Sequence, residues 1–289
     1  MRRGSWPIAA AGLAIAAVTI AAAAAVWAPA TVLNLVVSRS GYRIERDLAY
    51  GADPRQKLDL YVPDNLTAPA PVLLFFYGGS WQSGTKSWYL ALGQAFASKG
   101  IVVAIADYRV YPKVRYPAFV ADGAAALRFV HAVAAKHGGD PDRIFVAGHS
   151  AGAYIAAMLA ADPHYLMDAH AKPEWIRGVI GIAGPYDFLP LTDPALIALF
   201  GGAHRRDTQP ISYVDGKRAP MLLVTGDADA TVSPGNTTRM AARLRRFGSE
   251  VVTRAYPGTG HVGIILSLAP GLRWRTSLRR DMLDFIAAH

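Results

Sequence analysis

Six short, mostly apolar runs recur along the chain, and their apolar residues are consecutive instead of alternating with polar ones. Runs of this kind are typical of strands that are buried on both faces of a parallel sheet. We therefore predict parallel strands at Val72–Phe76, Ile101–Ala106, Ile144–Ala147, Val179–Ala183, Met221–Thr225 and Val251–Tyr256.

Segments with helical patterns separate these runs. Ahead of them, Arg43–Tyr50 and Lys57–Val62 predict an antiparallel hairpin around a Gly-Ala-Asp-Pro turn. Because strands and helices alternate, we expect an α/β fold with a mostly parallel central sheet flanked by helices. The predicted helices are Leu90–Lys99, Ala118–Lys136, Ala151–Ala161, Thr237–Phe247 and Ser277–Ala288.

The stretch from Pro185 to Arg218 interrupts this alternation. It holds four proline residues, paired glycines and no clear strand. Long irregular segments inside compact domains commonly cover functional sites. We predict a small cap or lid at about residues 185–218, within a folded domain that spans residues 39–289.

The first 38 residues form a different kind of segment. No charged residue occurs from Gly4 to Ser38, and the nineteen residues Ile8–Val26 are almost entirely Ala, Ile, Leu, Val and Gly. As a helix they would span roughly 28 Å, close to the hydrocarbon thickness of a bilayer. Arg2 and Arg3 precede them and place the N-terminus in the cytoplasm. We expect residues 1–38 to anchor the protein in a membrane, with the folded domain outside the cytoplasm.

Two other interpretations of this segment stay open. Ala28-Pro29-Ala30 has small residues at the spacing of a signal-peptidase site, so the segment can also be a cleaved signal of a secreted protein. It can also be a buried alanine-rich helix, although no polar face interrupts the apolar run. The anchor is favoured because the run exceeds the ~7–15 apolar residues of a usual signal core.

Composition and charge narrow the function classes. The 289 residues carry 30 Lys and Arg against 21 Asp and Glu, a net charge of +9, and no cysteine. Disulfides, thiol nucleophiles and cysteine-ligated metals are therefore excluded in this chain. The densest basic cluster lacks interleaved aromatic residues or a reading module, so we expect no nucleic-acid partner. We interpret this cluster as a solvated helix face that attracts anionic lipid headgroups: Arg239, Arg243, Arg245 and Arg246.

A candidate nucleophile follows the third predicted parallel strand. The strand runs directly into Gly148-His149-Ser150-Ala151-Gly152, and a predicted helix begins at once. A G-x-S-x-G motif between a buried strand and a helix predicts a sharp turn that exposes the serine hydroxyl at the helix N-terminus. We predict Ser150 to be a catalytic nucleophile.

A serine nucleophile needs a base, and the base needs an acid that orients it, in the chain order serine, acid, histidine. Asp227 and Asp229 both follow the strand that ends at Thr225. His261 is the one histidine at the exit of a predicted strand, in a glycine-rich segment that we expect to be a loop. We interpret His149 as a hydrogen-bonding neighbour of the nucleophile. The remaining histidines are interpreted as surface or cap residues: His131, His137, His164, His170, His204 and His289.

Binding of an oxyanion requires backbone N–H donors beside the nucleophile. The sequence Tyr77-Gly78-Gly79-Ser80-Trp81 follows the first predicted parallel strand, where this arrangement places its oxyanion loop. Paired glycines let the backbone turn its amides inward. We predict that Gly79 and Ser80, together with Ala151, form the oxyanion hole.

Three further motifs occur besides the G-x-S-x-G motif: Asp107-Tyr108-Arg109, the stretch Gly138–Ile144, and G-x-x-D-x-x-V starting at Gly226. Over roughly residues 42–286 the chain resembles α/β-hydrolases of the carboxylesterase and hormone-sensitive-lipase-like group. Within that group it is similar to the branch with an H-G-G-x-W loop, which includes kynurenine formamidases and isoprenylcysteine methylesterases.

This resemblance implies an α/β-hydrolase fold and assigns the acid to the fourth residue of the last motif, Asp229 instead of Asp227. It also implies structural roles for Asp107, Tyr108, Arg109 and Asp140. One position departs from the family, because Tyr77 stands where the oxyanion loop usually has histidine. A hydrogen-bonding aromatic residue can brace the loop in its place.

Together these features predict a serine hydrolase that cleaves small-molecule carboxylic esters through an acyl-enzyme, with the triad Ser150, Asp229 and His261. No metal or organic cofactor is implied. An amide or peptide hydrolase of the same fold is the first alternative, because the same triad serves both bonds. A hydrolase-fold protein that binds a ligand without turnover is the second.

Overall fold

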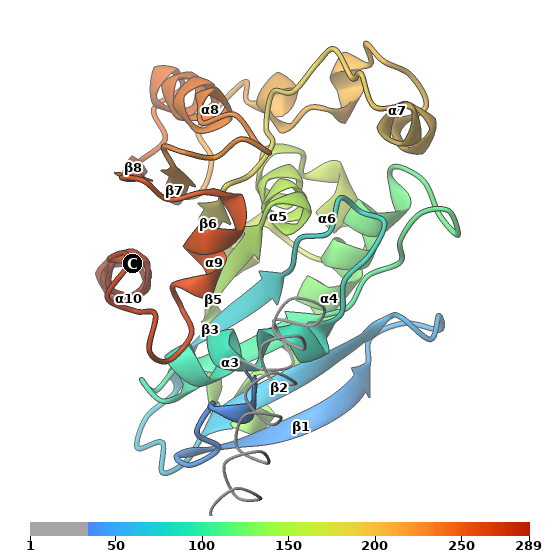
Figure 1. Ribbon diagram of the computed structural model, residues 1–289. Helices are drawn as coiled ribbons and strands as arrows, with labels where there is room; N and C mark the ends of the chain where they lie inside the picture. Colours follow the sequence, from blue (N-terminus) through green and yellow to red (C-terminus); the bar gives the residue numbers. More distant parts are fainter. Residues whose placement is uncertain (1–33) are drawn as a thin grey trace, which may run out of the picture.

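The computed structural model describes residues 34–289 and contains one central sheet (Figure 1). Its eight strands lie in the order β1-β2-β4-β3-β5-β6-β7-β8. Only the pairs β1–β2 and β2–β4 are antiparallel, so the predicted hairpin and the mostly parallel sheet are both confirmed. The strands are β1 Tyr42–Ala49, β2 Lys57–Pro63, β3 Ala70–Phe76, β4 Val102–Ala106, β5 Gly139–His149, β6 Ile176–Ile182, β7 Met221–Gly226 and β8 Val251–Tyr256.

Helices form at all five predicted places, within a few residues of the expected ends. They are α3 Leu90–Ala97, α4 Ala118–Val133, α5 Ala151–Ala161, α8 Gly235–Arg246 and α10 Leu278–Ala288. Shorter helical segments also occur that the sequence pattern does not reveal, because each has too few residues to show a helical period. They are η1 Lys86–Tyr89, η2 Ala135–His137, α6 His164–Asp168, η3 Pro173–Trp175, α7 Pro194–Phe200, η4 Arg206–Thr208, η5 Pro210–Tyr213 and α9 His261–Leu266.

The sheet is the middle layer between two layers of helices. Consecutive residues of a strand point to opposite faces. The ring of Phe75 in β3 lies 5.4 Å from that of Tyr89, just ahead of α3. The next residue, Phe76, points to the other face, where a Cβ added to Gly123 of α4 would lie 3.5 Å from its ring. Helices α3 and α10 cover the first face, and α4 and α5 cover the second (Figure 1).

Residues 185–218, predicted as a cap, contain α7, η4 and η5 and no strand. Several hydrogen bonds hold this segment on the core. The hydroxyl of Tyr154 in α5 donates to the carbonyl oxygen of Thr208 at 2.6 Å. The side-chain oxygen of Asn236 in α8 accepts from the N–H groups of Tyr186 and Asp187 at 2.9 and 2.8 Å. Residues 185–218 are therefore attached to both α5 and α8.

The predicted membrane anchor at residues 8–26 lies outside the described residues. Within residues 34–289, no helix combines the length and the apolar character that crossing a bilayer requires.

Candidate active site

Ser150 lies at the sharp turn between β5 and α5. Its backbone has φ 54° and ψ −121°, a conformation that residues other than glycine rarely adopt. The flanking glycines make this turn possible. A Cβ on Gly148 would lie 2.2 Å from the carbonyl carbon of Gly152, and a Cβ on Gly152 would lie 2.0 Å from the carbonyl oxygen of Phe76. Glycine at position 148 therefore lets the turn close, and glycine at position 152 lets it pack against β3.

The structure brings the hydroxyl of Ser150 and the side chains of His261 and Asp229 into one hydrogen-bonded chain. The imidazole Nε2 of His261 lies 2.9 Å from Oγ of Ser150, and its Nδ1 lies 2.7 Å from Oδ2 of Asp229. The carboxylate of Asp229 is buried, and its other oxygen accepts from the N–H groups of Thr231 and Val232, both at 2.9 Å. Because a carboxylate only accepts, Nδ1 carries the proton and Nε2 is free to accept the serine hydroxyl proton.

The two aspartates that follow β7 have different contacts. Asp227 is exposed, and its Oδ1 accepts from the N–H of Gly258 at 2.7 Å. It therefore braces the turn ahead of His261, whereas Asp229 contacts the imidazole itself.

His261 begins helix α9, although the glycine-rich sequence around it predicts a loop. Gly260, with φ −90° and ψ 177°, is extended and ends the loop immediately before the helix. The helix forms because Ile264 is buried in the core. The imidazole is consequently presented from the first residue of a helix.

His149, beside Ser150, is buried and supports His261. Its Nε2 donates to the carbonyl oxygen of His261 at 3.0 Å, and the two rings lie 4.8 Å apart. Its Nδ1 has no hydrogen-bond partner among residues 34–289. Burial, followed by the nearby imidazole of His261, lowers the pKa of His149 to about 3. His149 is therefore neutral near pH 7 and is a positioning residue, as the sequence suggests.

The loop after β3 passes directly beside Ser150. A Cβ on Gly78 would lie 2.9 Å from Cβ of Ser150, and the next two residues, Gly79 and Ser80, have φ values of 135° and 52°. Within the described part of the chain, the backbone N–H groups of Gly79, Ser80 and Ala151 have no hydrogen-bond acceptor. Free N–H groups at this place are suited to bind a developing oxyanion.

Tyr77, at the position where the family usually has histidine, braces this loop from beneath. Its hydroxyl donates to Oδ1 of Asp107 at 2.6 Å and accepts from Nη2 of Arg55 at 2.7 Å. Its ring stacks on that of Tyr108 with 4.9 Å between the centroids. Burial and the charge of Asp107 raise the pKa of Tyr77, which keeps the hydroxyl protonated. Tyr77 therefore supplies the hydrogen bonds that fix the start of the loop.

A cavity of about 380 Å³ opens above Ser150, between the oxyanion loop, the cap and the start of α8. One side is apolar and aromatic, with Trp81, Phe188 and Leu196. On the other side, the guanidinium of Arg239 forms an ion pair with Asp187. The remaining lining residues are Ser80, Pro185, Leu189, Thr231, Val232, Ser233 and Asn236.

No group of three or more His, Asp or Glu side chains with metal-binding geometry occurs in residues 34–289.

A family model described as BD-FAE matches residues 58–244 of the chain. The chain belongs to the BD-FAE family. The BD-FAE match extends from β2 to α8, so it includes Ser150 and Asp229 and ends before His261.

Two similar proteins are named as esterases. The probable isoprenylcysteine alpha-carbonyl methylesterase ICMEL1 of Arabidopsis thaliana is 31% identical over 77% of this chain and 52% of its own length. Esterase LipC of Mycobacterium tuberculosis is 32% identical over 76% of this chain and 60% of its own length. The chain thus spans about half to three fifths of these relatives.

Solved structures share the fold. A truncated form of a carbohydrate esterase from gut microbiota aligns with a TM-score of 0.73 and 21% identity, covering 87% of this chain and 98% of that one. An esterase of Thermogutta terrifontis aligns with a TM-score of 0.69 and 24% identity, covering 85% and 91%. These neighbours establish the α/β-hydrolase fold, as the sequence motifs predict.

Proposed function

We propose that this protein is a carboxylic ester hydrolase that works through an acyl-enzyme intermediate. The observation that carries the proposal is the hydrogen-bonded chain from Asp229 through His261 to Ser150, which ends at the cavity of about 380 Å³. The names of the family relatives support the same reaction class.

In the first half-reaction, Oγ of Ser150 attacks the ester carbonyl carbon while Nε2 of His261 takes the hydroxyl proton. The carbonyl oxygen becomes an oxyanion and accepts hydrogen bonds from the N–H groups of Gly79, Ser80 and Ala151. Collapse of this intermediate breaks the bond to the alcohol oxygen, which receives the proton from His261. Water then repeats the sequence on the acyl-serine and releases the acid.

Asp229 orients the imidazole during both half-reactions. Its carboxylate accepts a hydrogen bond from the Nδ1–H of His261 and stabilises the imidazolium ion that forms during each step. Because the N–H groups of Thr231 and Val232 donate to its second oxygen, the carboxylate is held in place beside the imidazole.

The cavity favours a small ester with a short acyl chain. Its apolar side, with Trp81, Phe188 and Leu196, suits a hydrocarbon group, and its volume is at the small end of the usual range for ligand pockets. An amide or peptide hydrolase is the alternative that uses the same triad, and an inactive ligand-binding protein is the other.

We also propose that residues 1–38 hold the enzyme at a membrane, with the domain of residues 39–289 outside the cytoplasm and residues 185–218 as its cap. The uncharged N-terminal segment behind Arg2 and Arg3 supports this location. After a high-salt wash, an anchored protein stays with the membrane fraction, because salt screens charges but leaves apolar insertion intact. Release of a soluble protein that begins near Thr31 would show a cleaved signal instead.

A fluorophosphonate probe tests the proposed mechanism, because it labels only an activated serine. We expect the wild-type protein to be labelled, Ser150→Ala to lose both labelling and hydrolysis of p-nitrophenyl acetate, and the exposed-site control Ser98→Ala to keep both. Labelling that persists in Ser150→Ala would contradict the proposal. A folded wild-type protein that is not labelled would support the ligand-binding alternative.

A further inference from the structure

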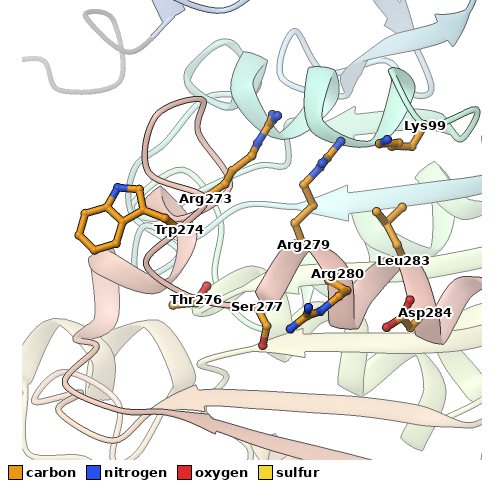
Figure 2. Close-up of a pocket in the computed structure, with 9 residues that line it drawn as sticks. All are labelled: Lys99, Arg273, Trp274, Thr276, Ser277, Arg279, Arg280, Leu283 and Asp284. Carbon is orange, nitrogen blue, oxygen red and sulfur yellow. The ribbon is translucent and has the colours of Figure 1, made fainter.

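A second cavity of about 530 Å³ lies between α3 and α10. Four basic side chains line it, Lys99, Arg273, Arg279 and Arg280, together with one carboxylate, Asp284. None of these residues lines the cavity above the nucleophile. Figure 2 shows Arg273 and Arg279 reaching toward α3 while Arg280 lies on the α10 side.

The charges of these four side chains are not neutralised by ion pairs. Arg273 donates to the carbonyl oxygen of Leu268 at 3.0 Å and to the side-chain oxygen of Gln94 at 2.6 Å. Arg279 donates to the carbonyl oxygen of Ala95 at 2.9 Å. All three acceptors are uncharged. In the part of the chain that the structure describes, no carboxylate oxygen lies within 4.0 Å of a nitrogen of the four side chains.

The basic side chains of this cavity differ in their partners from the arginine cluster on α8, the densest basic cluster in the sequence. Arg239 of that helix forms an ion pair with Asp187, and Arg243 donates to the carbonyl oxygen of Val214. In the cavity, by contrast, partial burial lowers the pKa of both Arg273 and Arg279. Half-buried like charges without a counter-ion destabilise the empty site, and an incoming anion relieves that repulsion.

We propose that the cavity between α3 and α10 binds a phosphate group. Three guanidinium groups and one ammonium group line the same cavity, and their many N–H donors and positive charges match the multiple oxygens and the double charge of a phosphate better than those of a single carboxylate. The volume leaves room for the group that the phosphate carries.

Two sources share this chemistry: the headgroup of an anionic phospholipid and a soluble phosphate ester. The described chain begins close to α3. The side chain of Asn34, its first residue, donates to the carbonyl oxygen of Ser87 in η1 at 2.8 Å, and η1 leads directly into α3. The indole of Trp274 at the cavity rim is 79% exposed. Exposed tryptophan beside basic side chains is typical of a surface at the headgroup level of a bilayer.

The test is calorimetric titration of the full-length protein in a non-ionic detergent. One arm uses inorganic phosphate, and the other uses a short-chain, ether-linked phosphatidylglycerol, which has no ester to hydrolyse. The matching ether-linked phosphatidylcholine controls for apolar binding. Binding in both arms supports a general phosphate site, and binding of the phosphatidylglycerol alone supports a headgroup site.

The variants Arg280→Gln and Lys99→Gln test the location, because neither side chain forms a hydrogen bond to the fold within residues 34–289. We expect each to weaken binding about tenfold, the loss of one charge-assisted contact. Arg246→Gln on α8 is the matched control and keeps wild-type affinity. Unchanged p-nitrophenyl acetate hydrolysis shows that the variants are folded. Binding in neither arm, or equal binding by Arg280→Gln and the control, would overturn the proposal.

Discussion

The imidazole of His149 donates a hydrogen bond to the backbone carbonyl oxygen of His261. The neighbouring residue Ser150 contacts the same histidine at its Nε2. Two consecutive residues of the turn after β5 therefore hold the proposed base: His149 binds its backbone and Ser150 contacts its ring. This relationship makes the neutral state of His149 a structural requirement, because a protonated imidazole would place a buried charge beside His261.

We expect His149 to make stability depend on pH in the acid range. Its pKa is about 3 in the folded protein and about 6.5 in the unfolded chain. Between these values only the unfolded chain binds the proton, so the free energy of unfolding falls with decreasing pH, by at most about 1.4 kcal/mol per pH unit from this residue. Urea unfolding at several pH values should show a shallower decline for His149→Gln, whose amide still donates. Parallel declines would contradict the assignment.

Substitution of the two aspartates should have unequal effects. Asp229→Asn removes the acceptor that fixes the Nδ1 proton of His261, and we expect kcat to fall roughly 10³–10⁴-fold. Asp227→Asn affects only the bond to Gly258 and should cost far less. Steady-state kinetics on p-nitrophenyl acetate measure both. Losses of similar size would mean that Asp227 also supports the imidazole or that the acid is misassigned.

Removing the hydroxyl of Tyr77 should weaken the oxyanion loop without touching substrate. Tyr77→Phe leaves Arg55 and Asp107 without the group that joins them, and we expect the free energy of unfolding to fall by about 1–3 kcal/mol. Thermal unfolding and kcat should both decrease. Tyr77→His, which restores the residue usual in the family, should recover part of each loss. A Phe variant with wild-type stability and rate would show that the loop does not depend on this bond.

The cavity above Ser150 predicts a preference for esters over amides. An amide requires protonation of a poor leaving group, and a peptide needs an extended chain to be held, whereas this cavity is short and partly apolar. We expect kcat/KM on p-nitrophenyl acetate and butyrate to exceed that on octanoate and on a matched p-nitroanilide. A higher value for the anilide than for every ester would support the amidase alternative.

Most of the fold is predictable from local sequence. Strands such as Val72–Phe76 are recognisable because burial on both faces demands continuous apolar residues. The position of Ser150 is recognisable because the G-x-S-x-G motif follows a strand and precedes a helix within a few residues. Short helices such as α9, which begins at His261, escape prediction, since six residues cannot display a helical period.

Contacts between distant segments are not visible in the sequence. His137, predicted to be a surface residue, is instead buried and lies 3.0 Å from the carboxylate of Glu45, a neighbour 92 positions away. Likewise, Lys99, after α3, and Arg273, before α10, line one cavity only because these two helices pack on the same face of the sheet. Charge density along the chain is highest on α8, although Arg239 and Arg243 of that helix bind other groups of the fold.

The bonds that hold residues 185–218 also have a kinetic consequence. Because Thr208 accepts a hydrogen bond from Tyr154 and the N–H of Tyr186 donates to Asn236, we expect residues 185–218 to keep this position whether or not an oil–water interface is present. The cavity above Ser150 is then already formed when the protein has folded, so it can bind single dissolved substrate molecules. Hydrolysis of a sparingly soluble ester should therefore rise hyperbolically with concentration and show no jump where the substrate begins to form droplets.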